Sequence, residues 1–204
     1  PVRPRLLEAL REGQPARVIT DWSREERVIV RRLQLLTTKP VLYVCNVDEE
    51  SAADGNALSA RVAERAATEG AETVIISAAI EAEISQLPSV EEKQEFLDTL
   101  GLAEAGLARL IASGYRLLDL ITFFTVGPKE ARAWTVRRDA TAPQAAGVIH
   151  SDFERGFIRA ETIGYEDYTR LNGEQGARDA GRLRQEGKDY VVQDGDVMLF
   201  RFNV

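Results

Sequence analysis

The sequence predicts an α/β protein in which part of a parallel-sheet domain is followed by a small α+β domain. Two short apolar runs, at residues 41–45 and 73–76, flank an alanine-rich helical pattern, and this strand–helix–strand order is typical of a parallel sheet. After residue 118 the pattern changes to short strands grouped around one helix. A chain of 204 residues that is 44% hydrophobic is long enough to bury the cores of two such domains.

The chain begins with a predicted helical segment. Ser23 and Glu26 have the spacing of a capping box, which predicts the start of a helix. That helix would place Ile29, Leu33 and Leu36 on one apolar face, while its opposite face carries the charges of an ordinary solvated surface.

The next segment predicts a βαβ unit. Val41–Cys45 and Thr73–Ile76 are continuous apolar runs of the kind found in strands buried on both faces, and residues 57–68 between them form a predicted helix. The strands run into the loops Asn46–Glu49 and Ser77–Ala79. In parallel sheets ligands collect beyond the carboxyl ends of the strands, so we expect these two loops to lie side by side at a binding site. Two further helices are predicted, at about residues 89–100 and 104–118.

The remaining segment predicts several strands and one helix. Ile121–Val126 and Ala133–Arg137 are separated by a turn at Gly127 and Pro128, and the helix spans Pro143–Phe153. Further strands are predicted at Ile158–Ile163, Tyr190–Val192 and Val197–Phe202.

Composition excludes some kinds of site. The single cysteine, Cys45, rules out an internal disulfide, and with one histidine, His150, a Cys/His zinc site is excluded. Cys45 is expected to be a small buried hydrophobe, and His150 to pack or hydrogen-bond beside Phe153. No apolar run approaches the roughly 20 residues that span a bilayer, and no signal-type apolar core is present, so no membrane partner and a cytoplasmic location are expected.

The charge distribution argues against non-specific binding to nucleic acid. The net charge is −7, and residues 51–100 alone carry this excess of Asp and Glu over Lys and Arg. Arg132, Arg137 and Arg138 are nevertheless candidates for contact with RNA or protein, an interpretation that competes with plain surface. Seven aromatic residues of the C-terminal segment are expected to pack in a core rather than to stack on bases: Phe123, Phe124, Trp134, Phe157, Tyr190, Phe200 and Phe202.

The loop Asn46–Glu49 suggests recognition of a purine base. In GTPases the corresponding Asn-Lys-x-Asp ends in an Asp whose two acceptors match the N1–H and N2–H donors of guanine. Here Glu49 stands at that position and Val47 replaces the Lys, offering apolar contact to the base. The N7 acceptor and N6 donor of adenine suit an amide, which Asn46 supplies. With the second loop as the other wall, the sequence predicts a site that favours adenine.

Several long stretches of the chain resemble one known family. Lys39–Glu49 is similar to the base-recognition strand of the YchF-type Obg-like ATPases, and Tyr115–Glu130 resembles the lead-in to their TGS domain. Ala142–Phe157 and Asp189–Val204 are similar to the most specific stretches of that family. The resemblance covers essentially the whole chain, with the segments in the expected order.

The resemblance implies a domain organisation. Residues 1–38 would be the returning part of a helical, coiled-coil insertion, and residues 39–118 the C-terminal part of an Obg-type, P-loop nucleotide-binding domain. Residues 119–204 would form a TGS domain with the β-grasp, ubiquitin-like fold.

The resemblance also implies a function. Members of the family prefer ATP, with GTP as a weaker ligand, need Mg²⁺, are helped by potassium and associate with ribosomes. Carried over to this chain, Asn46 and Val47 would contact adenine, and Glu49 would mark the departure from guanine recognition. Ser77, Ala78 and Ala79 would close the base pocket, and the protein is expected to be a monomer.

Two alternatives of another class stay open. The chain could be a non-catalytic module that docks ribosomal RNA or ribosomal protein. A regulatory role of the TGS portion, like those in threonyl-tRNA synthetases, is disfavoured because such enzymes would not need the Asn46 and Ser77 loops before that domain.

The machinery for phosphoryl transfer is missing from this sequence. Such transfer needs a glycine-rich loop, a Lys on the phosphate oxygens and a Ser or Thr on Mg²⁺. Gly101 and Gly106 have the spacing of a phosphate loop, but Leu107 and Ala108 replace its Lys and Ser/Thr. We therefore expect this chain alone neither to bind ATP tightly nor to hydrolyse it.

Overall fold

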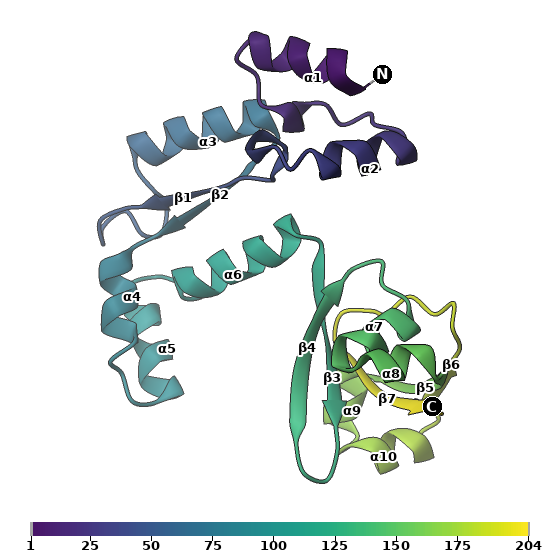
Figure 1. The fold of residues 1–204 in the computed structure, drawn as a ribbon. Coiled ribbons are helices and arrows are strands. Elements are labelled where there is room, and N and C mark those ends of the chain that lie inside the picture. The colour runs from purple at the N-terminus through teal and green to yellow at the C-terminus, as the bar shows by residue number, and fades with distance from the viewer. Residues whose placement is uncertain (1, 204) are drawn as a thin grey trace. The chain divides into compact units, whose positions relative to one another are not determined.

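The computed structural model describes residues 2–203, and the chain divides into two compact units (Figure 1). Unit 1 is Pro1–Leu117 and unit 2 is Leu118–Val204. Within the described residues no helix combines the length and the apolar character needed to cross a bilayer.

Unit 1 begins with two helices and two short 3-10 turns. The predicted capping box is confirmed: the Ser23 hydroxyl accepts from the backbone N–H of Glu26, and the Glu26 carboxylate accepts from the N–H of Ser23. A small cluster of buried side chains joins the helices to the intervening turn: Val2, Leu6, Ala16, Trp22 and Val30. The elements of this segment are α1 (Val2–Arg11), η1 (Ala16–Val18), α2 (Arg24–Arg32) and η2 (Leu36–Thr38).

The apolar face predicted for α2 is not the face that this chain buries. Val30 is buried, whereas Ile29 and Leu33 are 50% and 48% exposed. The helix ends at Arg32, and Gln34 then takes a positive φ of 49°, so Leu36 does not continue the helix face.

The parallel βαβ unit is present as predicted. Strands β1 (Leu42–Asn46) and β2 (Glu72–Ile76) pair in parallel, and helix α3 (Ala57–Glu69) connects them. Asn56 caps the start of α3, because its side chain accepts from the N–H groups of Leu58 and Ser59. Helix α3 lies along one side of the two strands and α6 (Gly106–Leu117) along the other (Figure 1).

The expectation that both strands are buried on both faces is wrong for β1. Val44 is 44% exposed and Cys45 is half-buried. The reason is that the sheet in the described part of unit 1 has only two strands, so the side chains of each strand lack a neighbouring strand on one side.

Two shorter helices lie between β2 and α6. Helix α4 (Ala78–Ile84) follows β2 after a single residue, and α5 (Val90–Thr99) is capped by the Ser89 hydroxyl, which accepts from the N–H of Glu92. A second small cluster holds them together: Ala52, Ile80, Ile84, Leu97 and Leu102.

Unit 2 is a five-stranded sheet with a helix on one face. The strand order is β4-β3-β7-β5-β6, in which β3 and β7 are parallel and the other neighbours antiparallel. The first and last strands of the unit therefore meet in the middle of the sheet. The strands are β3 (Leu120–Val126), β4 (Ala131–Arg137), β5 (Phe157–Gly164), β6 (Arg184–Glu186) and β7 (Asp196–Phe202).

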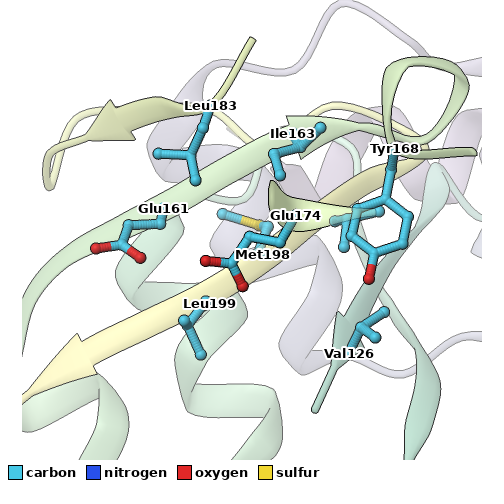
Figure 2. Close-up of a pocket in the computed structure, with 9 residues that line it drawn as sticks. Val126, Glu161, Ile163, Tyr168, Glu174, Leu183, Met198 and Leu199 are labelled. Carbon is cyan, nitrogen blue, oxygen red and sulfur yellow. The ribbon is translucent and has the colours of Figure 1, made fainter. Parts of the chain in front are cut away.

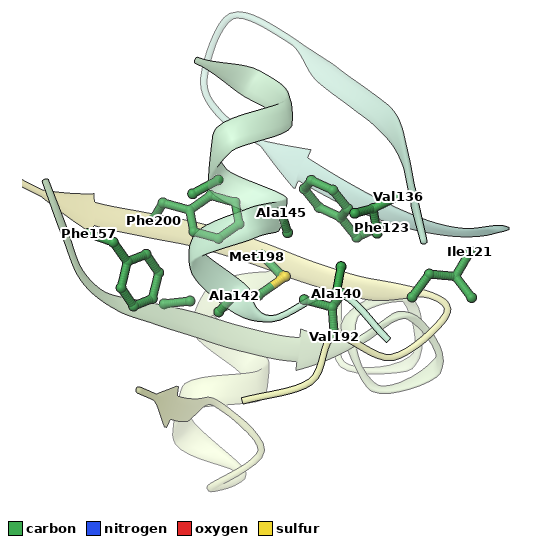
Figure 3. Close-up of a cluster of buried hydrophobic side chains, with 12 residues drawn as sticks. Ile121, Phe123, Val136, Ala140, Ala142, Ala145, Phe157, Val192, Met198 and Phe200 are labelled. Carbon is green, nitrogen blue, oxygen red and sulfur yellow. The ribbon is translucent and has the colours of Figure 1, made fainter. Parts of the chain in front are cut away.

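The core of unit 2 lies between this sheet and helix α7 (Ala142–Ile149), as Figure 3 shows. Three alanines of α7, Ala142, Ala145 and Ala146, are fully buried and let the helix approach the strands closely. Phe123 is fully buried and meets Phe200 edge to face, with ring centroids 6.0 Å apart. The expected packing of the aromatic side chains in a core is confirmed for Phe123, Phe157 and Phe200, which are buried, but is wrong for Phe202, which is 40% exposed at the end of β7.

Unit 2 departs from the prediction at five elements. The predicted helix Pro143–Phe153 is broken at His150, which ends α7 and begins α8 (Ser151–Arg155). Tyr190–Val192 makes only an isolated bridge, from Val191 to Thr141. Strand β6 and the short helices α9 (Tyr165–Arg170) and α10 (Glu174–Asp179) were not predicted.

Candidate nucleotide-binding site

The ends of β1 and β2 lie side by side. Asn46, the last residue of β1, is the register partner of Ile76, the last residue of β2. The N–H of Val47 donates to the carbonyl oxygen of Ile76 at 2.9 Å, which extends the ladder by one residue. The two predicted loops thus start at the same edge of the sheet, and this predicted adjacency is confirmed.

A direct hydrogen bond joins the two loops. The side-chain Oδ1 of Asn46 accepts from the backbone N–H of Ala78 at 2.9 Å. This bond fixes the orientation of the amide. It leaves the Nδ2 donor of the exposed Asn46 side chain with no partner among the described residues.

Ser77 is the buried residue of the second loop. It is 2% exposed, and its hydroxyl oxygen has no hydrogen-bond partner among the described residues. Ser77 occupies the N-cap position of α4, yet its side chain makes no capping bond. An unpaired buried hydroxyl is unfavourable, which singles this group out among the residues of the two loops.

The prediction of a loop at Ser77–Ala79 is wrong in detail. Ala78 and Ala79 are exposed and form the first turn of α4, because alanine favours the helix and Ser77 in an extended conformation ends the strand. The second wall of the candidate site is therefore a helix start.

The first loop turns sharply after Val47. The Asp48 carboxylate accepts from the N–H of Ser51 at 2.9 Å, and the Glu49 carbonyl accepts from the N–H of Ala52 at 3.2 Å. The Glu49 side chain is exposed, with no hydrogen bond to the described residues. Its carboxylate therefore has no hydrogen-bond partner in the described part of the chain. Val47, two residues earlier, is half-buried.

Sequence reasoning missed Glu81, the residue that ties this region to α6. Its Oε1 accepts from the backbone N–H of Gly106 at 2.6 Å. Gly106 therefore starts a helix whose first N–H binds a carboxylate, and it does not belong to a phosphate loop. The sequence holds only a weak signal for this contact, since the partners are 25 residues apart.

The other candidate residues belong to unit 2. The Nδ1 of His150 accepts from the N–H of Asp152 at 3.1 Å, so the expected hydrogen-bonding role is confirmed. Arg132 stacks on Trp134, 4.1 Å from its ring centroid. Arg137 is five residues from Arg132 along β4, so the two side chains point to opposite faces of the sheet and do not form one patch.

Unit 2 contains a small cavity on the face of the sheet opposite α7 (Figure 2). Its volume of about 20 Å³ holds about one water molecule and no nucleotide. Glu161 on its wall accepts from Arg201 at 3.1 Å, and this bond lowers the pKa of Glu161. The lining residues are Val126, Glu161, Ile163, Tyr168, Glu174, Leu183, Val197, Met198 and Leu199.

Metal ligands are not gathered in the described part of the chain. Residues 2–203 contain no group of three or more His, Cys, Asp or Glu side chains arranged to hold an ion.

Comparison with known proteins identifies close relatives. A family model described as "YchF-GTPase_C: Protein of unknown function (DUF933)" matches residues 120–203. The "Ribosome-binding ATPase YchF" of Bacillus subtilis is 52% identical over 98% of this chain and 55% of its own length. The protein of the same name from Escherichia coli O157:H7 is 54% identical over 90% of this chain and 50% of its own length. The chain spans about half the length of the curated relatives it matches.

A solved structure of a relative has the same fold. The "Structure of the Schizosaccharomyces pombe YchF GTPase" superposes with a TM-score of 0.85 and 33% identity, covering 98% of this chain and 53% of that one. A GTP-binding protein from Pyrococcus horikoshii, at 20% identity and a TM-score of 0.57, supports the fold alone. The chain belongs to the YchF family of Obg-like ATPases and corresponds to the C-terminal part of its members.

Proposed function

We propose that this chain supplies the purine-recognition loops of a ribosome-associated protein that binds and hydrolyses ATP. The observation that carries the proposal is the pairing of Asn46 with Ala78 where the two parallel strands end. In sheets of this kind, that edge is where ligands bind. The names of the relatives, ribosome-binding ATPases, agree with it.

The orientation of Asn46 decides which base edge it can read. Its free Nδ2 donates to N7, an acceptor that adenine and guanine share. Its Oδ1, already bonded to Ala78, keeps a second lone pair for the N6 amine of adenine. Guanine presents the O6 acceptor there, and two facing acceptors repel. The amide therefore favours adenine, with GTP as the weaker ligand.

Three other residue groups complete the proposed base site. Glu49 is one methylene longer than the Asp that pairs with guanine, so its carboxylate is displaced from the N1–H and N2–H donors. Val47 and the exposed Ala78 and Ala79 offer apolar contact to the ring. The unpaired hydroxyl of Ser77 fits a polar atom of the ligand or of the rest of the protein.

The phosphates need groups that this sequence does not contain. We assign the phosphate-binding loop, and the ligands of Mg²⁺ and potassium, to the half of the relatives' length that this chain does not match. In this proposal residues 1–38 belong to a helical insertion and residues 39–118 to the nucleotide-binding domain.

We further propose that residues 119–204 are a TGS domain. The strand order β4-β3-β7-β5-β6, with the parallel pair β3 and β7 in the middle and α7 across one face, is the β-grasp arrangement. This domain is the proposed surface for the ribosome.

The test compares nucleotide affinities of the intact protein that carries this chain. Asn46→Ala should weaken the binding of ATP by about tenfold or more. Glu49→Asp should raise the affinity for GTP relative to that for ATP by a similar factor. Glu50→Asp, a neighbouring exposed carboxylate, is the matched control and should change neither. If Asn46→Ala and Glu49→Asp both leave the affinities unchanged, the base site is refuted. Co-sedimentation of the chain with ribosomes would then test the interaction-module alternative.

A further inference from the structure

Glu81 connects two helices at the edge of the proposed base site. It lies in the first turn of α4, where its N–H donates to the carbonyl oxygen of Ser77 at 3.0 Å. Its side chain leaves α4 and accepts from the N–H of Gly106, the first residue of α6, at 2.6 Å. A carboxylate at the start of a helix is also favoured by the helix dipole.

The contact is closely packed. Gly106 is buried, and a Cβ atom at this position would lie 3.0 Å from Oε1 of Glu81 and 3.1 Å from Cγ2 of Ile76. Ile76 is the register partner of Asn46. The start of α6 is therefore fitted against both the Glu81 carboxylate and the strand end that carries the base loops.

These bonds form a continuous series that ends at Asn46. Gly106 binds Glu81, Glu81 belongs to the first turn of α4, and the N–H of Ala78 in that turn binds Oδ1 of Asn46. Helix α4 has only seven residues, and a helix of this length is not stable without tertiary contacts. The first turn of α4 therefore depends on tertiary contacts such as the one from Glu81 to Gly106, and so does the orientation of the Asn46 amide.

We propose that Glu81 is a positioning residue for purine recognition: by holding α4 against α6 it keeps Ala78 in place and so orients the Asn46 amide. The proposal rests on the proposed function, because it deepens the account of the same base site. Glu81 itself does not touch the nucleotide. Its role is to make the base wall rigid before the ligand arrives.

The first test uses the intact protein and two ligands. Glu81→Ala should weaken the binding of ATP by about five- to twentyfold. Inorganic tripolyphosphate, which has no base, should bind as before. Glu81→Gln keeps an acceptor oxygen and should restore most of the ATP affinity. Glu83→Ala removes the same charge from an exposed position of the same helix and should have no effect.

A second variant covers the case in which Glu81→Ala does not fold. Glu81→Asp keeps the charge but shortens the side chain by one methylene, so the carboxylate no longer reaches Gly106. It should show the same selective loss of ATP. The positioning role would be overturned if the variants lost affinity for ATP and for tripolyphosphate equally. It would also be overturned if folded Glu81→Ala or Glu81→Asp bound ATP with unchanged affinity.

The tests separate this inference from the proposed function. If Asn46→Ala weakens ATP while the Glu81 variants do not, the base site stands and the role of Glu81 is refuted. If Asn46→Ala is itself without effect, the proposed function fails. Amide exchange of the 204-residue chain gives a ligand-free readout: the Ala78 N–H should exchange faster in Glu81→Ala than in Glu83→Ala, and equal rates would count against the inference.

Discussion

Replacing Ser77 by alanine should stabilise this chain and at the same time weaken purine binding by the intact protein. The Ser77 hydroxyl is buried and unpaired, and leaving such a group unpaired costs about 1–3 kcal/mol. The usual loss of about 0.5–2 kcal/mol for removing an N-cap does not apply, because the side chain makes no capping bond. The void left by one oxygen offsets part of the gain. We expect a net stabilisation of about 0.5–2 kcal/mol.

Ser59 provides a matched control with the opposite sign. It is also a buried serine, at 7% exposed, but its hydroxyl accepts from the N–H of Asn56 at 2.8 Å and donates to the carbonyl oxygen of Asn56 at 2.9 Å. Ser59→Ala breaks both bonds and should destabilise unit 1 by about 1 kcal/mol.

The assay can follow unit 1 alone. The chain has two tryptophans, Trp22 in unit 1 and Trp134 in unit 2, so a Trp134→Phe background leaves only the buried Trp22 to report urea unfolding. In thermal unfolding followed by the same fluorescence, each kcal/mol of change in the free energy of unfolding should shift the melting temperature of a unit of this size by about 4 °C. The reasoning is refuted if Ser77→Ala destabilises unit 1 as Ser59→Ala does, since the hydroxyl would then have a partner in the folded chain. An unchanged ATP affinity of the intact Ser77→Ala protein would remove this hydroxyl from the base site.

Three further predictions test other parts of the structure. Phe123→Ala should destabilise unit 2 by about 3–5 kcal/mol, because the ring is fully buried, and unaltered unfolding followed by Trp134 fluorescence would contradict this. Arg17 donates to Glu69 at 2.7 Å, and this bond, with smaller contributions from Tyr43 and Arg65, lowers the pKa of Glu69 below its ordinary value of 4.5. Because the pKa is depressed in the folded state, the stabilisation is complete above 4.5 and is lost as the pH falls through the folded value. Urea midpoints between about pH 7 and 3 should therefore fall less for Glu69→Gln than for the wild type, and parallel curves would argue against the pairing. Finally, the 204-residue chain with ATP, Mg²⁺ and potassium should release no phosphate above the buffer rate, whereas turnover abolished by Asn46→Ala would show that the expectation is wrong.

Local sequence signals located most of the elements around the candidate site. Apolar runs marked β1 and β2, and the rule that parallel strands end at one edge placed Asn46 beside the Ser77 turn. The Ser23 capping box predicted the start of α2 because its bonds join residues only three apart. These features depend on neighbouring residues and on one general rule of sheet topology.

Features that depend on contacts between residues far apart in the sequence could not be predicted from such local signals. The bond from Gly106 to Glu81 joins α4 and α6, and no periodic pattern encodes it. The break of the predicted helix at His150 arises because its Nδ1 caps a new helix, competing with the apolar pattern that favoured one continuous helix. Helices α9 and α10 have six residues each, too short for an apolar repeat to stand out.

The pairing of β3 with β7 has a consequence for how unit 2 is assembled. Phe124 and Val197 are partners at the centre of the sheet although about 70 residues of chain separate them, and such non-local contacts form slowly. Strand β7 lies between β3 and β5. Until β7 has been synthesised, the facing edges of these two strands are unpaired and open to aggregation. A chain cut before Asp196 would keep four of the five strands but only as two separate pairs, β4-β3 and β5-β6, because β7 is the strand that joins them.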